Sequence, residues 1–178
     1  MKKDKGGRMK NELATGLPQN YAVLLSDIKH RVRHAQTRAV LAVNAELIRL
    51  YWEIGALIDR RQQQEGWGAG VIPRLARDLH NELPEEKGFS ERNIKRMLAF
   101  YREYPHLEFG PQAAAQMAPG TKVPQAVALF PVELIQSVPW GHHAELMTRI
   151  KDHATRRWYM QATVTNGWSR NILLMQIE

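Results

Sequence analysis

The segment Gly88-Phe89-Ser90-Glu91-Arg92-Asn93-Ile94 nearly recurs as Gly167-Trp168-Ser169-Arg170-Asn171-Ile172. Both copies read glycine, an aromatic residue, serine and then Arg-Asn-Ile, with one residue fewer in the second copy. A serine at this place caps the free amides of a first helical turn, and the aromatic residue before it packs onto an apolar residue one turn later. We therefore predict that Ser90 and Ser169 each begin a helix.

Helical periodicity flanks the first copy on both sides. Upstream, Pro73 suits the first turn of a helix, whose buried row we expect to be Ile72, Leu75, Ala76, Leu79 and Leu83. Downstream, the helix that Ser90 begins ends before Pro105, and we expect its buried row to be Ile94, Met97, Leu98 and Tyr101. Two helices joined by a short turn with glycine are typical of a helix-turn-helix, and we place such a pair at about residues 70–104.

A longer apolar pattern precedes this pair. A helical stretch begins near residues 18–20, and its apolar face holds Tyr21, Leu24, Leu25, Ile28 and Val32. A much longer helix follows, with a heptad row whose spacings are 3, 4, 3, 4 and 3: Val40, Val43, Leu47, Leu50, Ile54 and Leu57. A second row, of Ile48, Tyr51, Gly55 and Ile58, makes the apolar stripe wider than one partner helix covers. We expect a central helix, with another helix close to Gly55.

No pair of strand patterns with a hairpin turn occurs, so the expected fold class is all-α, a helical bundle with a long central helix. Residues 1–17 are expected to form a flexible basic tail and residues 18–178 a single helical domain. Residues 105–139 contain six of the nine prolines and are interpreted as a Pro/Ala-rich connection, with one short helix near 132–138. Helical patterning resumes after it, and Asn166-Gly167 separates the last two helices.

The composition argues against a disulfide-bonded, secreted or membrane-spanning protein. The net charge is +7, of which residues 1–10 supply +4, so the body of the chain is only mildly basic. The absence of cysteine excludes disulfides and thiolate metal sites. No apolar run approaches the roughly 18 residues that span a bilayer, and the charged start lacks the apolar stretch of a secretory signal. We expect a cytoplasmic protein that has no membrane partner.

The helix that Ser90 begins is the candidate nucleic-acid surface. At about 100° per residue, Arg92, Arg96, Ala99 and Glu103 lie opposite its buried row. Arginine and asparagine near the amino end of such a helix reach base edges, while other cations meet phosphates. The predicted groove-facing residues are Arg92, Asn93 and Arg96, and the predicted phosphate contacts are Lys95, Arg102, Lys87, Arg77 and Arg74. The alternative is an ordinary solvated face, which Glu91 and Glu103 make less basic.

The helix after Ser169 differs, because it is apolar on nearly every side. Packing within the domain, or docking to another chain or domain, is favoured there over DNA recognition. Together with the heptad row, this helix supplies the predicted oligomer or docking residues: Val43, Leu47, Leu50, Ile54, Leu174 and Ile177.

Other chemical signals are weak. Glu85-Glu86-Lys87 imitates the end of a nuclease motif but follows a helix-ending proline, so we reject it as catalytic. His30 and His34 lie one helical turn apart among cationic residues, which disfavours a metal ion. His142 and His143 are expected to make hydrogen bonds at a helix start, and the five tryptophans to be core and staple residues. We expect no catalytic residue, metal or cofactor.

Several motifs in order resemble the YhcG-type N-terminal domain over about residues 20–178. The first group comprises Asn44, Tyr51-Trp52-Glu53-Ile54-Gly55, Gly66-Trp67-Gly68, Asp78-Leu79, Gly88-Phe89-Ser90, Arg92-Asn93 and Phe100-Tyr101. The second comprises Pro139-Trp140-Gly141-His142, Arg157-Trp158-Tyr159 and Gly167-Trp168-Ser169-Arg170. The resemblance implies a bacterial DNA-handling protein whose helical domain contributes DNA binding and usually precedes a PD-(D/E)xK nuclease domain. No catalytic residue of that nuclease can be carried over to this chain, so we expect it not to be an enzyme.

Two functions follow as expectations. The first is DNA binding by a helical domain that acts as the targeting or scaffold part of a restriction-like nuclease system. The alternative is a helical interaction or oligomerisation module that does not contact DNA. The expected partners are accordingly DNA, a second copy of the chain, or a nuclease domain or subunit, and a free-standing nuclease is disfavoured.

Overall fold

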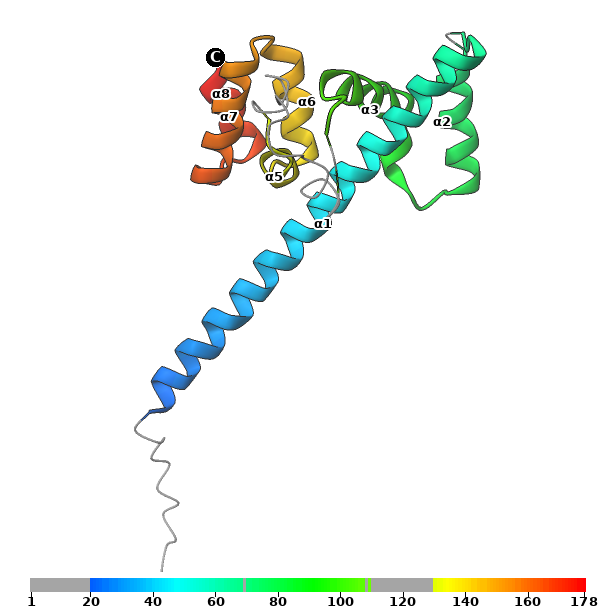
Figure 1. Ribbon diagram of the computed structural model, residues 1–178. Coiled ribbons are helices and arrows are strands. Elements are labelled where there is room, and N and C mark those ends of the chain that lie inside the picture. The colour runs from blue at the N-terminus through cyan, green and yellow to red at the C-terminus, as the bar shows by residue number, and fades with distance from the viewer. Residues whose placement is uncertain (1–19, 69, 108, 110–129) are drawn as a thin grey trace, which may run out of the picture. The chain divides into compact units, whose positions relative to one another are not determined.

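The computed structural model describes residues 20–68, 70–107, 109 and 130–178, and within them it contains helices and no strands. The α-helices are α1 (Tyr21–Glu65), α2 (Val71–Glu82), α3 (Glu91–Glu103), α5 (Val132–Ser137), α6 (Trp140–Arg149), α7 (His153–Asn166) and α8 (Arg170–Ile177) (Figure 1). A short 3-10 helix, η1 (Lys87–Phe89), precedes α3. The all-α prediction is confirmed. The predicted tail at 1–17 and most of the connection at 105–139 lie outside the described residues.

Helix α1 is one helix of 45 residues, although the sequence predicts two successive helical stretches. The polar run between Val32 and Val40 interrupts the apolar period, yet it contains no glycine or proline that would end a helix. The chain divides after Arg38 into two compact units, residues 1–38 and 39–178. Within residues 20–38, every side chain of α1 is exposed.

In the unit of residues 39–178, the second apolar row of α1 forms the core. Ile48, Tyr51, Gly55 and Ile58 are buried. The heptad row, expected to be the principal seam, lies at the border of that buried face: Leu47 and Ile54 pack against the core, whereas Val40, Val43, Leu50 and Leu57 are exposed. The helices of this unit therefore cover the second row of α1 and leave much of the first row uncovered.

Helix α3 packs directly against α1 at Gly55. A Cβ atom on Gly55 would stand 2.3 Å from the carbonyl oxygen of Met97, so only glycine permits this approach. Buried side chains of α1, α2 and α3 form one cluster around the contact: Tyr51, Ile58, Ile72, Ile94, Met97 and Leu98. The close approach predicted at Gly55 is confirmed.

Two assignments of buried residues need correction. Leu83, expected to be buried, is the C-cap residue of α2 and is exposed, because the helix ends before the side chain can turn inward. Phe100 was not assigned to the core, yet it is fully buried and forms edge-to-face contacts with Tyr104 and Trp140.

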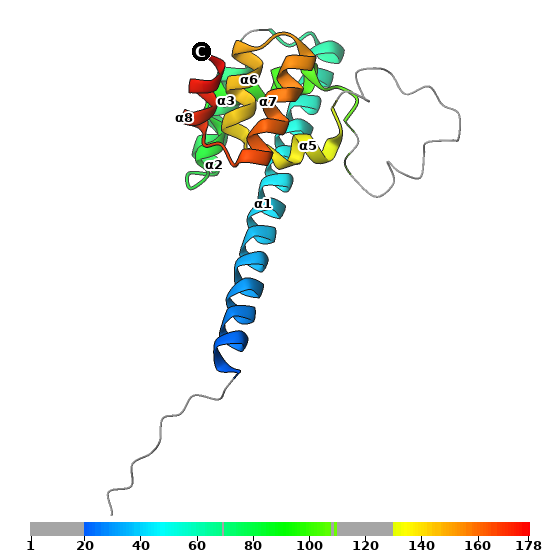
Figure 2. The same ribbon diagram turned by 90° about the vertical axis from the view of Figure 1, so that its left-hand side faces the viewer.

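Helices α5 to α8 gather around a second cluster, whose fully buried members include Phe100, Ile135, Leu146, Met160 and Leu173 (Figures 1 and 2). Gly167 ends α7 in the left-handed conformation (φ 62°), which favours glycine. The Ser169 hydroxyl then accepts a hydrogen bond from the amide of Ile172 and caps α8. The short helix expected near 132–138 and the two final helices are thereby confirmed.

A buried arginine joins the end of α3 to α7. Arg156 is 1% exposed; it donates to the Ile150 carbonyl from Nε (3.0 Å) and Nη2 (2.7 Å), and Nη1 donates to the carboxylate of Glu103 and the hydroxyl of Tyr104. Burial raises the pKa of Tyr104 to about 12. Burial also works to raise the pKa of Glu103, but hydrogen bonds from Arg156 and His153 outweigh it, so that pKa is lowered. The charge of Arg156 is thus compensated inside the fold.

Candidate nucleic-acid interface

The inner face of α3 is held by side chains from other elements. Ser90 caps the helix by accepting from the amide of Asn93 (3.3 Å), as the sequence predicts. The side chain of Asn93 donates to the carbonyl of Gly88 and accepts from the indole Nε1 of Trp140 (2.7 Å). The ring of Tyr51 lies edge-on to that indole, with 4.8 Å between the two ring centroids. The amino end of α3 is therefore tied both to its preceding turn and to α6.

The bonds of Asn93 bear on its predicted role. Both ends of its amide are occupied within the chain, and the residue is half-buried. A base-reading asparagine needs both ends free, because it donates to and accepts from adenine together. We therefore remove Asn93 from the proposed DNA contacts and assign it to positioning α3.

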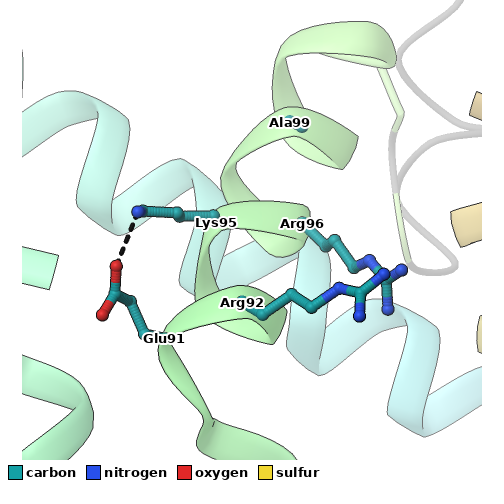
Figure 3. A pocket seen from close by; sticks show the side chains of 5 residues that line it. All are labelled: Glu91, Arg92, Lys95, Arg96 and Ala99. Carbon is teal, nitrogen blue, oxygen red and sulfur yellow. Dashed lines mark hydrogen bonds and ion pairs between the residues drawn. The ribbon is translucent and has the colours of Figure 1, made fainter. Parts of the chain in front are cut away.

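The outer face of α3 carries the two remaining groove candidates. Arg92 and Arg96 are one helical turn apart, and their side chains extend from α3 toward the same side in Figure 3. Arg92 is exposed and Arg96 half-buried, and neither forms an ion pair with any described residue. An open depression of about 550 Å³ lies here, lined by Glu91, Arg92, Lys95, Arg96 and Ala99.

The acidic residues expected to weaken this face are partly neutralised. Glu91 pairs with Lys95 (2.6 Å), so its charge is compensated where both residues line the same depression as the two arginines (Figure 3). Glu103, predicted to share the outer row, instead turns to Arg156 and His153 and is half-buried. The amino-terminal half of the outer face is consequently positive at Arg92 and Arg96.

The predicted phosphate contacts fall into two groups. Arg102 pairs with Asp59 on α1 (2.7 Å), and Arg74 pairs with Asp78 (3.3 Å). Arg77 and Lys87 are exposed and form no ion pair with a described residue. The structure thus brings Arg92 and Arg96 together and leaves Arg77 and Lys87 accessible, while Arg102 already serves to hold α3 against α1.

The connection between α2 and α3 is longer than expected. It comprises residues 83–90 and includes η1, whereas a helix-turn-helix joins its helices through three or four residues. Pro84 and the charged residues after it extend the chain before Gly88. The two helices nevertheless pack on each other through buried side chains of α2 and α3.

The remaining candidates take structural places. His142 and His143 donate from Nε2 to the carbonyls of Trp168 (2.8 Å) and Ile135 (2.9 Å), as expected for hydrogen-bonding residues at a helix start. His30 and His34 stack on an exposed face of α1. No group of three metal-ligating side chains occurs among the residues that the structure describes.

Three of the five tryptophans pack against the core, whereas Trp67 only donates to the carboxylate of Glu65 (2.7 Å) and Trp158 is exposed. Trp52 donates to the carbonyl of Tyr104 (2.8 Å), and Trp140 and Trp168 pack against the second cluster. Trp158 is 60% exposed on α7 and lies against Tyr159 and Trp168. Its place on a helix whose buried row is Arg156, Met160 and Thr163 explains the exposure.

Trp140 is the positioning residue that sequence reasoning missed. The motif Pro139-Trp140-Gly141-His142 marks it, but nothing in the periodicity of α6 pairs it with Asn93. Burial of Tyr51 at the same place raises the pKa of its hydroxyl.

The residues predicted for docking are only partly available. Leu174 and Ile177 are half-buried, and Ile177 packs against the second cluster. The exposed apolar residues of α8 are instead Ile172 and Met175. On α1, Val43 and Leu50 of the predicted set are exposed.

Comparison with known proteins places the chain. It is 30% identical over 178 aligned residues to a protein of Escherichia coli (strain K12) named "Putative nuclease YhcG", an alignment that covers 93% of this chain and 46% of that protein. The chain thus spans about half the length of this relative. No solved structure matches it. No described helix contains an apolar stretch that would reach across a lipid bilayer. The model of the DUF1016 N-terminal domain matches residues 27–178, and the chain belongs to that family.

Proposed function

We propose that the outer face of α3 binds duplex DNA, and that the domain thereby serves as the targeting part of a nuclease system. The observation that carries this proposal is that Arg92 and Arg96 line one open depression and that neither forms an ion pair with a described residue. Guanidinium groups bind phosphate oxygens through two parallel hydrogen bonds. The similarity to a protein named as a nuclease supports DNA as the polyanion.

The expected mode of binding is contact with the DNA backbone. Asn93 is engaged within the fold, so Arg92 and Arg96 are the groups left near the amino end of α3. Arg77 and Lys87 add positive charge on α2 and on the connection before α3. Lys95 and Arg74 are exposed at the surface but share their charge with a carboxylate, and we assign them a smaller part. Such contacts give affinity with little sequence preference.

The experiment is a titration against duplex DNA at two salt concentrations. Arg92→Glu combined with Arg96→Glu should weaken binding at least about tenfold and should reduce the slope of log K against log salt by about 2, one for each lost contact. The matched control is Arg60→Glu combined with Arg149→Glu, which alters two exposed arginines outside α3 and changes the net charge equally.

Three results would contradict the proposal. Unchanged binding by the α3 variant removes the proposed face. An equal loss in the control variant means that net charge alone drives binding. If the protein binds duplex RNA more tightly than duplex DNA, with the same dependence on Arg92 and Arg96, the ligand of this face is RNA and the assignment of DNA is wrong.

A second function, helix-mediated assembly, is favoured by a different observation. Apolar side chains of α1 remain exposed along much of the helix, including Ile28 and Val32 in residues 20–38 and Val43 and Leu50 in residues 39–178. The DNA-binding variants do not touch this surface, so the two functions can be tested independently.

A further inference from the structure

Two rows of apolar residues on α1 are largely exposed. The first, which we name the N row, consists of Tyr21, Leu25, Ile28 and Val32, each between 41% and 49% exposed. The second, the C row, is the heptad row Val40, Val43, Leu47, Leu50, Ile54 and Leu57, four of which are between 43% and 70% exposed while Leu47 and Ile54 border the core. Isolated exposed apolar residues are ordinary, but rows at helical spacing indicate an interface.

The spacings of the two rows match when one is read backwards. The N row has spacings of 4, 3 and 4, and the C row read backwards from Ile54 to Val43 has the same spacings of 4, 3 and 4. In an antiparallel pair, Tyr21 would meet Ile54 and Leu25 would meet Leu50. Alternating spacings of three and four are those by which one helix packs along another.

The charges of the two segments are complementary. Residues 20–38 contain four Lys or Arg and one Asp, a net charge of +3. Residues 39–58 contain Glu46, Arg49 and Glu53, a net charge of −1, and Arg49 already pairs with Glu53 (2.9 Å). A parallel pair would place +3 against +3, whereas an antiparallel pair places +3 against −1. Electrostatics therefore selects the antiparallel orientation.

We propose that the N row of one copy packs antiparallel on the C row of a second copy, so that α1 forms the seam of a homodimer. A two-fold symmetric dimer uses each row once in each copy, which makes the interface self-complementary. The proposal is independent of DNA binding, because neither row includes a residue of α3. It also accounts for a helical segment at 21–38 whose side chains are all exposed, since such a segment is marginal without packing.

The first test is the mass of the full chain in solution, by light scattering over a range of concentrations. Wild type should be a dimer. Ile28→Glu in the N row and Leu50→Glu in the C row should each raise the dimer dissociation constant about hundredfold or more, because each buries an unpaired carboxylate in the seam. The matched controls are Val23→Glu and Leu41→Glu, which alter exposed apolar residues that belong to neither row.

The second test is orientation, and it uses the absence of cysteine from the chain. Under mild oxidation, a mixture of Leu25→Cys and Leu50→Cys chains should form disulfide-linked dimers between the two variants. Leu25→Cys alone should not cross-link, because the two copies of position 25 lie far apart along an antiparallel seam.

Each contrary outcome is decisive. A wild-type monomer at every concentration, or a dimer that tolerates both row variants, overturns the proposal. Cross-linking of Leu25→Cys with itself establishes a parallel pair and overturns the antiparallel seam. Association seen only with added DNA means that the rows do not hold the dimer. Circular dichroism of each variant confirms that the helices remain folded.

Discussion

At the scale of single residues, Gly55 and Asn93 hold α3 in the position from which Arg92 and Arg96 project. Gly55 lets the backbone of α3 approach α1, and Asn93 ties the start of α3 to the preceding turn and to α6. Neither residue presents a group to solvent that would bind DNA. Their effect is to hold the amino end of α3 firmly, so that Arg92 and Arg96 project from a rigid support.

Gly55→Ala should destabilise the protein even though alanine is the better helix former by about 1 kcal/mol. The added Cβ would meet the backbone carbonyl of Met97, which no side-chain rotation can move. We expect a net loss of about 2 kcal/mol in the free energy of unfolding, measured by urea denaturation.

Gly70→Ala is the matched control. A Cβ atom on Gly70 meets nothing within 4 Å, and its backbone lies in the right-handed helical region. Its stability should therefore be unchanged or slightly higher. Equal effects of the two substitutions would show that close helix approach is not what Gly55 provides.

At the scale of elements, the capping serines and the glycine at a helix end predicted those helix ends correctly. Ser90 and Ser169 cap α3 and α8, and Gly167 ends α7, because each motif acts through the backbone next to it. The face on which α1 is buried was harder to predict. Helix α1 has two apolar rows, and either could be the buried one. The second row is buried because α3 can approach α1 closely only at Gly55, which belongs to that row.

Ser90→Ala and Ser169→Ala should each lower the free energy of unfolding by about 1 kcal/mol, because each leaves an amide of the first helical turn without its cap. Ser90→Asp and Ser169→Asp retain an acceptor oxygen and should restore most of the loss. Thermal denaturation of the four variants measures this. If the aspartate variants were no more stable than the alanine variants, helix capping would not explain why serine occurs in both copies of the repeated segment.

Much of the candidate site was predictable, within a limit set by tertiary contacts. The helical period alone puts Arg92 and Arg96 on the outer face of α3, and the structure agrees. The same period cannot reveal that Arg102 meets Asp59 or that Asn93 meets Trp140, since those partners lie on other helices. On α3 the helical period gives the outward position of Arg92 and Arg96, whereas the bonding partners of Arg102 and Asn93 follow from the assembled fold.

At the scale of the whole molecule, a buried histidine links stability to pH. His143 is fully buried, its Nε2 donates to the Ile135 carbonyl, and its Nδ1 has no partner among the described residues. Burial lowers the pKa of His143 from 6.5 to about 4, so the ring is neutral in the folded protein at neutral pH. Protonation would place a second, unbonded N–H in the core beside Phe100.

The sign of the pH effect follows from that shift. Between about pH 6.5 and pH 4, the unfolded chain binds a proton at position 143 that the folded protein does not. The free energy of unfolding should therefore decrease as the pH falls through this window, by up to about 3 kcal/mol from this group. Urea denaturation at a series of pH values measures the slope.

His143→Gln is the comparison that isolates the group. Glutamine can donate to the same carbonyl and does not titrate, so the slope between about pH 6.5 and pH 5 should flatten, while the losses at lower pH from carboxylates such as Glu103 remain. An identical slope in wild type and variant would show that the pH dependence has another origin.

The place of Trp140 has an optical consequence. Its indole bonds to Asn93 and lies against the rings of Tyr51 and Phe100, at the junction of α1, α3 and α6. The emission of that fluorophore therefore depends on whether these three helices are assembled and on any shift of α3 when a ligand arrives. Trp140 is thus a fluorophore on the inner side of the helix that is proposed to meet DNA, and in a variant that keeps Trp140 alone of the five tryptophans we expect its emission to change when DNA binds.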